Sequence, residues 1–341
     1  MKIGIAYDLN PKTDLPAGSP DDLYEEFDSE ETIDALVEVF RKLGHEPIRL
    51  GGGRAFLDNM LKDPPDLVFN MSEGEGIGRS REARVPAVCE MLNIPCCGSD
   101  PLTMGLALDK DLARRTVEDA EVVTPQGLVI QFPESRYDGD FAEFPAILEE
   151  AGLPLPIIAK PVCEGSSKGI RGKSLIADAR DFGPTVVSLW HDYRQPVLVE
   201  EFIAGDEVTV GIIGNGGEAE VLGSMHITPR VADENFVYSL DVKRDWRNRV
   251  DYACPPNLPA ATIAAVENVA LAAYDILGCR DFARIDFRIR EGIPYFLEAN
   301  PLPGLNPETG DICVMARLLG ISYEELIGSI LNAAMKRLQL A

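Results

Sequence analysis

The sequence predicts a mixed α/β (α+β) fold with two or three domains, and three observations lead to it. The chain has 341 residues, and domains average about 150 residues. Early in the chain, short apolar runs alternate with amphipathic helical patterns, which is typical of a parallel sheet with right-handed crossovers. Late in the chain, the apolar runs Ala283–Ile289 and Pro294–Glu298 flank Glu291-Gly292, which predicts an antiparallel hairpin.

The first segment, residues 1–98, carries the alternating pattern. Ser29 is a suitable N-cap for a helix over Ser29–Leu43, where apolar residues recur at helical spacing from Ile33 to Phe40. Asn10–Asp22 is rich in Pro, Gly and Asp, and we expect it to be a loop over the edge of the sheet. The expected strands of this segment are Lys2–Tyr7, His45–Leu50, Asp66–Asn70 and Ile94–Cys97.

Two further segments, residues 99–203 and 204–341, are expected to hold longer strands and helices. The expected strands are Pro156–Val162, Val197–Phe202 and Glu207–Ile213, in addition to the hairpin. The expected helices are Asp109–Glu118, Ala260–Leu277 and Tyr323–Leu338.

Composition excludes several classes of function. The chain has 56 Asp+Glu against 32 Lys+Arg, a formal charge of −24, which argues against nucleic acid or an anionic membrane as a partner. No apolar run approaches the roughly 20 residues of a membrane helix, and the start runs directly into an expected strand rather than a signal peptide. The seven cysteines lack paired spacing, which favours free thiols over a zinc site. We therefore expect a cytoplasmic protein.

The hairpin within Phe282–Gly304 is the most informative stretch. Pairing around its turn places Asp286 nearly opposite Glu298, and Asn300 lies on the same strand face as Glu298. Two carboxylates and an amide oxygen on one face are hard oxygen ligands that suit Mg²⁺. The alternative is a polar, solvent-facing strand surface. The rigid Pro-Leu-Pro-Gly turn that follows, which can aim a backbone N–H, favours a site.

Ala159–Ile170 places Lys160 at the end of an apolar strand, before a Gly-Ser-Ser turn. Such a turn can cover a triphosphate with backbone N–H groups while the lysine neutralises it, although the string is not a Walker A loop. The alternative is a solvent turn beside a surface lysine. Because a strand-end lysine aimed at phosphate contributes little packing, we expect Lys160→Ala to lower turnover more than stability.

Two weaker patterns complete the set. In Val197–Val210, the strand ends in acidic residues. The backbone near Ile203 could contact an adenine, and Glu200 could accept a hydrogen bond from the adenine amino group. Glu207 could bind ribose hydroxyls. Strands that end in acidic residues are common, however. Lys110 lies early in a helix, where a plain surface lysine is the alternative.

In this order and at these separations, the four patterns resemble the ATP-grasp superfamily, specifically the D-alanine–D-alanine ligase group, from about Asp66 to Leu319. The resemblance implies a Rossmann-like N-terminal domain (1–98), a central ATP-binding subdomain (99–203) and a C-terminal ATP-grasp subdomain with the metal and catalytic residues (204–341). It implies that two sheets clamp ATP, with two Mg²⁺ ions (or Mn²⁺) and an acyl-phosphate intermediate. It also suggests a homodimer.

The resemblance assigns roles to individual residues. The residues implied to hold ATP are Lys110, Lys160, Glu200, Ile203 and Glu207. Those implied to bind metal are Asp286, Glu298 and Asn300. Those implied to act in catalysis are Arg284 at the transferring phosphoryl group, Gly304 as a backbone oxyanion donor, Lys243 of a closing loop, and Ser166.

The sequence departs from the ligase pattern where amino-acid substrates would lie. Glu73 stands in place of a histidine, and Arg244 stands in place of a tyrosine after Lys243. No residue matches the opening glutamate that holds the first ammonium group. Arg79, with two neighbouring arginines, falls near the expected cleft, although a solvated helix face is the alternative. We therefore expect a substrate with an extra anion, and we expect Arg244 to face either acidic side chains or that substrate.

The leading hypothesis is an ATP-dependent ligase that joins amino acids other than plain D-alanine, or peptides, as small-molecule substrates. The alternatives are a true D-alanine–D-alanine ligase of cell-wall synthesis, a nucleotide-binding module without catalysis, and an ATP-grasp kinase without an amine acceptor.

Overall fold

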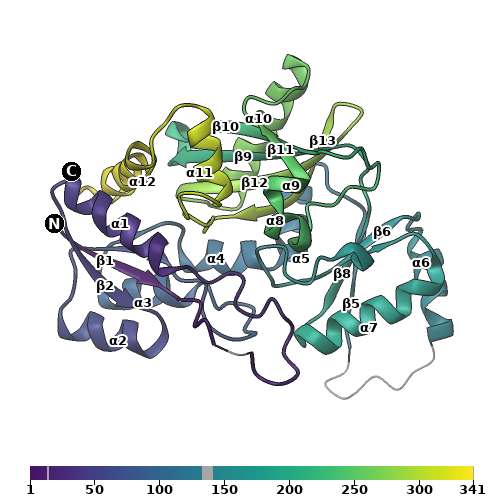
Figure 1. Cartoon of the computed structure of the whole chain (residues 1–341), viewed down its shortest axis with the longest axis horizontal. Helices are drawn as coiled ribbons and strands as arrows, with labels where there is room; N and C mark the ends of the chain where they lie inside the picture. Colours follow the sequence, from purple (N-terminus) through teal and green to yellow (C-terminus); the bar gives the residue numbers. More distant parts are fainter. Residues whose placement is uncertain (14, 133–140, 341) are drawn as a thin grey trace.

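The computed structural model describes residues 1–13, 15–132 and 141–340, which form three β-sheets with helices packed around them (Figure 1). One sheet is parallel with the order β2-β1-β3-β4. The second is antiparallel with the order β5-β8-β6-β7, and the third is antiparallel with the order β11-β10-β9-β12-β13. The mixed α/β class predicted from the sequence is confirmed.

The N-terminal sheet contains β1 (Lys2–Tyr7), β2 (Glu46–Gly51), β3 (Leu67–Met71) and β4 (Cys96–Cys97). Its helices are α1 (Glu30–Lys42), α2 (Gly53–Lys62) and α3 (Arg84–Leu92). The Ser29 side chain accepts a hydrogen bond from the Thr32 amide, which confirms the predicted N-cap of α1. The strand expected at Ile94–Cys97 is shorter than predicted.

The central part contains β5 (Gly127–Ile130), β6 (Ile157–Pro161), β7 (Leu175–Ile176) and β8 (Val197–Glu201). Its helices are α4 (Pro101–Leu108), α5 (Lys110–Asp119), α6 (Phe144–Ala151) and α7 (Phe182–Tyr193). Buried aromatic side chains of α6 and α7, including Phe144, Phe182 and Trp190, form the core behind this sheet.

The C-terminal sheet contains β9 (Asp206–Gly214), β10 (Glu220–Pro229), β11 (Val250–Ala253), β12 (Asp281–Arg290) and β13 (Ile293–Asn300). Its helices are α8 (Leu240–Arg244), α9 (Trp246–Arg249), α10 (Ala260–Ile276), α11 (Asp311–Leu318) and α12 (Tyr323–Leu338). The hairpin of β12 and β13 and the long helices α10 and α12 were predicted from the sequence. β10 was not predicted, because Gly223, Ser224 and His226 interrupt its alternation of apolar residues.

The last helix, α12, packs between the C-terminal sheet, where it contacts β9 and β12, and the N-terminal part, where it contacts α1 and β4 (Figure 1). Its buried side chains share one core with those of β1, β3 and α1. Phe69 of β3 stacks on Phe282 of β12, with ring centroids 6.5 Å apart, and the Gly98 amide donates to Asp281 over 2.8 Å. The two ends of the chain are therefore joined through a common core.

Across residues 1–13, 15–132 and 141–340, none of the helices has both the length and the apolar character needed to cross a membrane.

Candidate active site

Two cavities lie where the three sheets meet. The small cavity, about 90 Å³, lies between the two antiparallel sheets and is lined by residues of β6, β8, β9 and β12. The large cavity, about 500 Å³, also takes lining residues from the N-terminal part. Five residues line both cavities, namely Tyr238, Lys243, Arg284, Glu298 and Asp311, so a ligand that fills the small cavity would reach the large one at these side chains.

Charged side chains of the small cavity neutralise one another. Lys160 of β6 forms an ion pair with Glu200 of β8 over 2.6 Å, and both side chains are almost fully buried. Arg288 of β12 donates to Glu207 over 2.8 Å and to the Ile203 carbonyl over 2.8 Å. Although Arg288 opposes the effect, burial raises the pKa of Glu207. The pairing contradicts our view that Lys160 contributes little to stability, because its removal leaves Glu200 buried without a partner.

The segment expected to meet adenine has little free backbone. The amide of Glu201 donates to Gln126 and that of Phe202 donates to Pro156, so both are already engaged. The amide of Ile203 has no such partner among the described residues, and Ile203 lines the small cavity. Ile203 is therefore the residue of this segment that can donate a backbone hydrogen bond to a ligand.

The three predicted metal ligands lie together on the hairpin. Asp286 is the direct register partner of Glu298, and Asn300 donates to Asp286 over 3.1 Å. We reasoned that these carboxylates need a cation between them, but the chain supplies positive charge itself. Arg284 donates twice to Asp286, at 2.9 and 2.8 Å, and Lys110 pairs with Glu298 over 3.0 Å.

Glu298 is ionised in this surrounding. Burial opposes its charge, but Lys110, Lys160 and Arg284 together hold the pKa of Glu298 well below its usual range. Two carboxylates and an amide oxygen are a donor set that fits Mg²⁺, which commonly takes one or two protein carboxylates and completes its shell with phosphate oxygens and water.

Several predicted catalytic residues face the large cavity. Arg284 pairs with Asp311 over 3.1 Å, and Gly304 lies in the loop that follows β13. The Lys243 ammonium lies 4.9 Å from the centre of the Tyr238 ring and forms no ion pair among the described side chains. Ser166 lines the cavity with a φ of 48°, a left-handed conformation that is uncommon for serine. Their chemical roles stay predictions.

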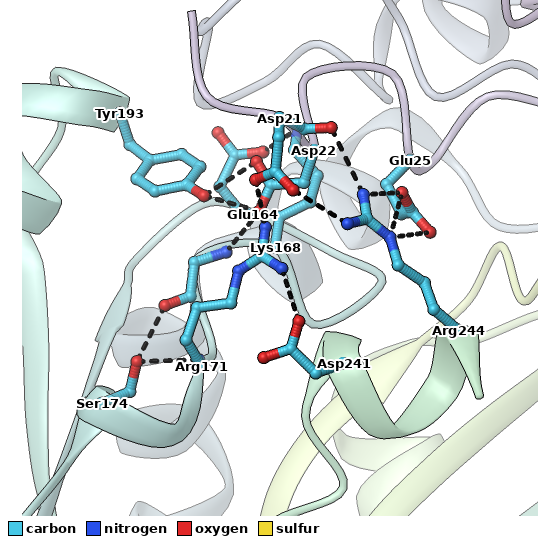
Figure 2. Close-up of polar contacts among 11 residues, drawn as sticks. Asp21, Asp22, Glu25, Glu164, Lys168, Arg171, Ser174, Tyr193, Asp241 and Arg244 are labelled. Atoms are coloured by element: carbon cyan, nitrogen blue, oxygen red, sulfur yellow. Dashed lines mark hydrogen bonds and ion pairs between the residues drawn. The ribbon is translucent and has the colours of Figure 1, made fainter. Parts of the chain in front are cut away.

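The loop between β1 and α1, residues 8–29, here called the N-terminal loop, reaches across to the central and C-terminal parts, further than the sheet edge that we expected for Asn10–Asp22 (Figure 2). Arg244 pairs with Asp21 over 2.9 Å and with Glu25 over 2.6 Å. Arg171 contacts Asp21 and also pairs with Asp241 of α8 over 3.0 Å. Arg244 does face acidic side chains, but they are those of this loop. Residue 14 of the loop lies outside the described residues.

Beneath this loop is a buried ionic cluster that we did not predict. Arg81, whose side chain is 1% exposed, donates to both carboxylate oxygens of Glu26 over 3.0 Å and to the Cys163 carbonyl over 2.7 Å. Lys168 pairs with Glu26 over 3.2 Å and also with Glu164. No local pattern indicated Glu26, because it lies in an irregular loop far from Arg81 in sequence.

The arginines that suggested an anionic substrate are all engaged within the chain. Arg79 is an exposed side chain that pairs with Asp109 over 3.0 Å, and Arg84 donates to the Glu75 carbonyl over 2.7 Å. Neither lines the large cavity. With Arg81 and Arg244 also paired, the structure gives no support for an extra anion on the substrate, whereas Glu73 does line the cavity.

Comparison with known proteins finds related sequences and a shared fold. The family model described as "D-ala D-ala ligase C-terminus" matches residues 129–332. An uncharacterized protein of Sinorhizobium fredii, y4sG, is 29% identical over 313 residues, which are 89% of this chain and 87% of that protein. A protein of Polaromonas naphthalenivorans named D-alanine–D-alanine ligase is 34% identical over 259 residues, which are 74% of each chain.

A solved structure shares the fold. The D-alanine–D-alanine ligase of Bacillus anthracis, crystallised with ATP, aligns with a TM-score of 0.71 over 98% of both chains, at 22% identity.

Proposed function

The chain belongs to the D-alanine–D-alanine ligase family of ATP-dependent carbon–nitrogen ligases, which have the ATP-grasp fold, and on this premise we propose that it joins two amino acids, or an amino acid and a peptide, through an acyl phosphate. The observation that carries the proposal is the meeting of the two cavities. Lys243, Arg284 and Glu298 line both, so the end of a nucleotide in the small cavity would face a substrate in the large one.

The chemistry follows from the weakness of a carboxylate as an electrophile. In the first step, a carboxylate oxygen of one substrate bonds to the γ-phosphorus of ATP, and ADP leaves. In the second, the amine of the other substrate attacks the acyl carbon, phosphate leaves with the electrons of the broken C–O bond, and the amine loses a proton. Both steps build negative charge that a site must neutralise.

The chain's own residues are suited to these steps. Lys110 and Lys160 would hold the phosphates, and Lys243, which has no acidic partner among the described side chains, is free to meet the γ-phosphate. Arg284 would stabilise the oxyanion together with the amide of Gly304. The N-terminal loop, held by Arg244, covers the cavity and would limit the access of water, which hydrolyses acyl phosphates.

Asp286, Glu298 and Asn300 are the residues that would hold Mg²⁺. The metal, when bound, would supply positive charge to the phosphate oxygens. Lys110 would then exchange Glu298 for a phosphate oxygen, since one ammonium group can serve either anion.

We further propose that the preferred substrate is not plain D-alanine, because Glu73 and Arg244 differ from the ligase pattern at the substrate end. The experiment measures the release of ADP and phosphate over a panel of amino acids and dipeptides, with mass spectrometry of the products. We expect equal amounts of ADP, phosphate and ligated product. ADP release without an amide product would indicate a kinase, and no ADP release under any condition would indicate a binding module.

A further inference from the structure

The acidic side chains that line the large cavity fall into two groups. Five of them have a basic partner from the chain itself: Glu25 with Arg244, Glu26 with Arg81, Glu164 with Lys168, Glu298 with Lys110, and Asp311 with Arg284. The other three are Asp28, Glu73 and Glu82, and within the described residues their carboxylates make no hydrogen bond or ion pair. We call these three side chains the acid pocket.

The acid pocket lies at the carboxyl edge of the parallel sheet. Glu73 follows β3, and Asp28 is bridged to Leu9, which follows β1. Glu82 lies just before α3 and is 6% exposed, although it lines the cavity. This edge is where open α/β sheets bind ligands. A carboxylate that is more than nine-tenths buried, faces a cavity and lacks a partner indicates a missing cation.

Protonation in the free protein is consistent with a missing cation. Burial, with a smaller contribution from Asp8, raises the pKa of Asp28 to about 7. Burial also raises the pKa of Glu82 to about 7, and burial together with Glu82 and Glu26 raises that of Glu73 well above its usual value. A bound cation would favour the ionised forms instead.

Among the residues that the structure describes, no basic side chain forms an ion pair with Asp28, Glu73 or Glu82. Arg81, which directly precedes Glu82 in sequence, is already bonded to Glu26 and a backbone carbonyl. Lys110, Lys243 and Arg284 belong to the end of the cavity where the phosphoryl group would lie. In the part of the chain that the structure describes, no three His, Cys, Asp or Glu side chains converge closely enough to hold a metal ion. Separated carboxylates around a cavity suit an extended organic cation better.

We propose that the acid pocket binds the positively charged side chain of an amino-acid substrate, so that this ligase prefers a dibasic amino acid, with an ammonium or guanidinium side chain, over a neutral one. The proposal rests on the proposed function for its ligase chemistry and adds the substrate class. The α-ammonium group of a neutral amino acid carries one positive charge, which would compensate only part of the charge of three ionised carboxylates, of which Glu82 is buried and Asp28 and Glu73 are half-buried. A second positive charge on the side chain would compensate more of the charge that these carboxylates carry once they are ionised.

The test compares amino acids that differ in one charge. Binding of ornithine and norvaline, and of lysine and norleucine, as both enantiomers, is measured by calorimetry on the full chain with Mg²⁺ and a non-hydrolysable ATP analogue. Turnover is measured with ATP on the same pairs. Because hydrogen bonds to charged groups each contribute about 1.5–3 kcal/mol, we expect the dibasic member to bind about 10- to 100-fold more tightly.

Substitutions in the acid pocket test whether its carboxylates cause the preference for a dibasic amino acid. Glu82→Gln and Glu73→Gln should each bring the ratio of dibasic to neutral binding towards one. Glu75→Gln is the matched control, because Glu75 is an exposed neighbour that does not line the large cavity, and it should keep the ratio. Thermal unfolding checks that each variant is folded. We expect no loss of stability in Glu82→Gln, since it removes an unpaired buried carboxylate.

The outcomes separate the two proposals. A dibasic preference that depends on Glu82, without amide formation, would support the acid pocket and contradict the ligase function. Amide formation from neutral amino acids, with equal binding of the charged and neutral members, would support the ligase and overturn the acid pocket. A dibasic preference that Glu82→Gln and Glu73→Gln both leave intact, or no measurable binding of any dibasic amino acid, would also overturn it.

Discussion

The small cavity and the acid pocket both adjoin the large cavity, and their acidic side chains differ in whether they have basic partners. In the small cavity, the acidic side chains Glu200, Glu207, Asp286 and Glu298 each touch a basic side chain. In the acid pocket, Asp28, Glu73 and Glu82 touch none that the structure describes. The pKa of Glu298 is accordingly lowered, whereas the pKa values of Asp28 and Glu82 are raised to about 7.

The difference indicates two ways to prepare a site for a charged ligand. In the small cavity, acidic partners hold the lysines in place. A polyanionic ligand could replace those partners at the lysines, and its metal could bind the carboxylates that are released. The acid pocket keeps its carboxylates protonated until a cation enters. In the first arrangement each charge already has a partner in the free protein, whereas the second costs stability at neutral pH until the ligand binds.

The largest effect on stability should come from breaking a pair in the small cavity. Lys160→Ala leaves the Glu200 carboxylate buried alone, which should lower the free energy of unfolding by about 3–5 kcal/mol. Urea unfolding measures this loss. The double variant Lys160→Met, Glu200→Gln is the control and should recover most of it. Wild-type stability in Lys160→Ala would mean that water solvates Glu200.

The next largest effect should be on turnover. Glu298→Gln keeps the shape of the side chain but removes a charge that would hold Mg²⁺ and that pairs with Lys110. We expect turnover to fall on the order of 10²–10³-fold, the size typical of losing one electrostatic contact to the transition state. Steady-state ADP release over a Mg²⁺ titration measures it. If Glu298→Gln responds to Mg²⁺ and turns over as the wild type does, the metal assignment is wrong.

The sequence was sufficient to predict the small cavity because its residues lie on regular elements. Asp286 and Glu298 were placed opposite one another by the alternation of a hairpin, and the structure confirms that register. The strand ends at Lys160 and Glu200 were predicted in the same way, but their ion pair was not, because β6 and β8 are separated by a long stretch of chain. Local periodicity does not reveal which distant strands become neighbours.

The large cavity was harder to predict because loops build it. Glu26 and Glu82 precede helices or follow turns without a repeating pattern, and their partners or neighbours are distant in sequence. Arg79 and Arg244 were identified as unusual residues, but composition alone could not show that Asp109, Asp21 and Glu25 neutralise them. The contact of α12 with α1 and β4 of the N-terminal part was not predicted for the same reason.

A smaller effect should appear in the pH dependence of stability. The pKa of Glu82 is raised by burial in the folded protein to about 7, from its ordinary value of 4.5. Its contribution to stability is therefore fully present below about pH 4.5 and is lost as the pH rises through about 7. Without ligand, the melting temperature should fall between pH 5.5 and pH 8 by a few degrees more in the wild type than in Glu82→Gln.

His45 and His226, whose pKa values are lowered by burial, act in the opposite direction in both proteins and cancel in this difference. Equal pH profiles would contradict a buried, unpaired Glu82.

The smallest effect on stability should come from Arg244, which holds the N-terminal loop over the large cavity. Its partners Asp21 and Glu25 are 65% and 29% exposed, and such pairs contribute about 0–1 kcal/mol because water and salt screen them. Arg244→Ala should therefore change the free energy of unfolding by no more than about 1 kcal/mol.

The effect of Arg244→Ala on KM for the amino acid should be larger than its effect on stability, because the loop that it releases also carries Asp28 of the acid pocket. Arg230→Ala is the matched control, since Arg230 forms an exposed pair with Asp251 away from both cavities. If Arg244→Ala instead raises KM for acidic amino acids alone, Arg244 binds the substrate directly, and our first expectation of an anionic substrate regains its support.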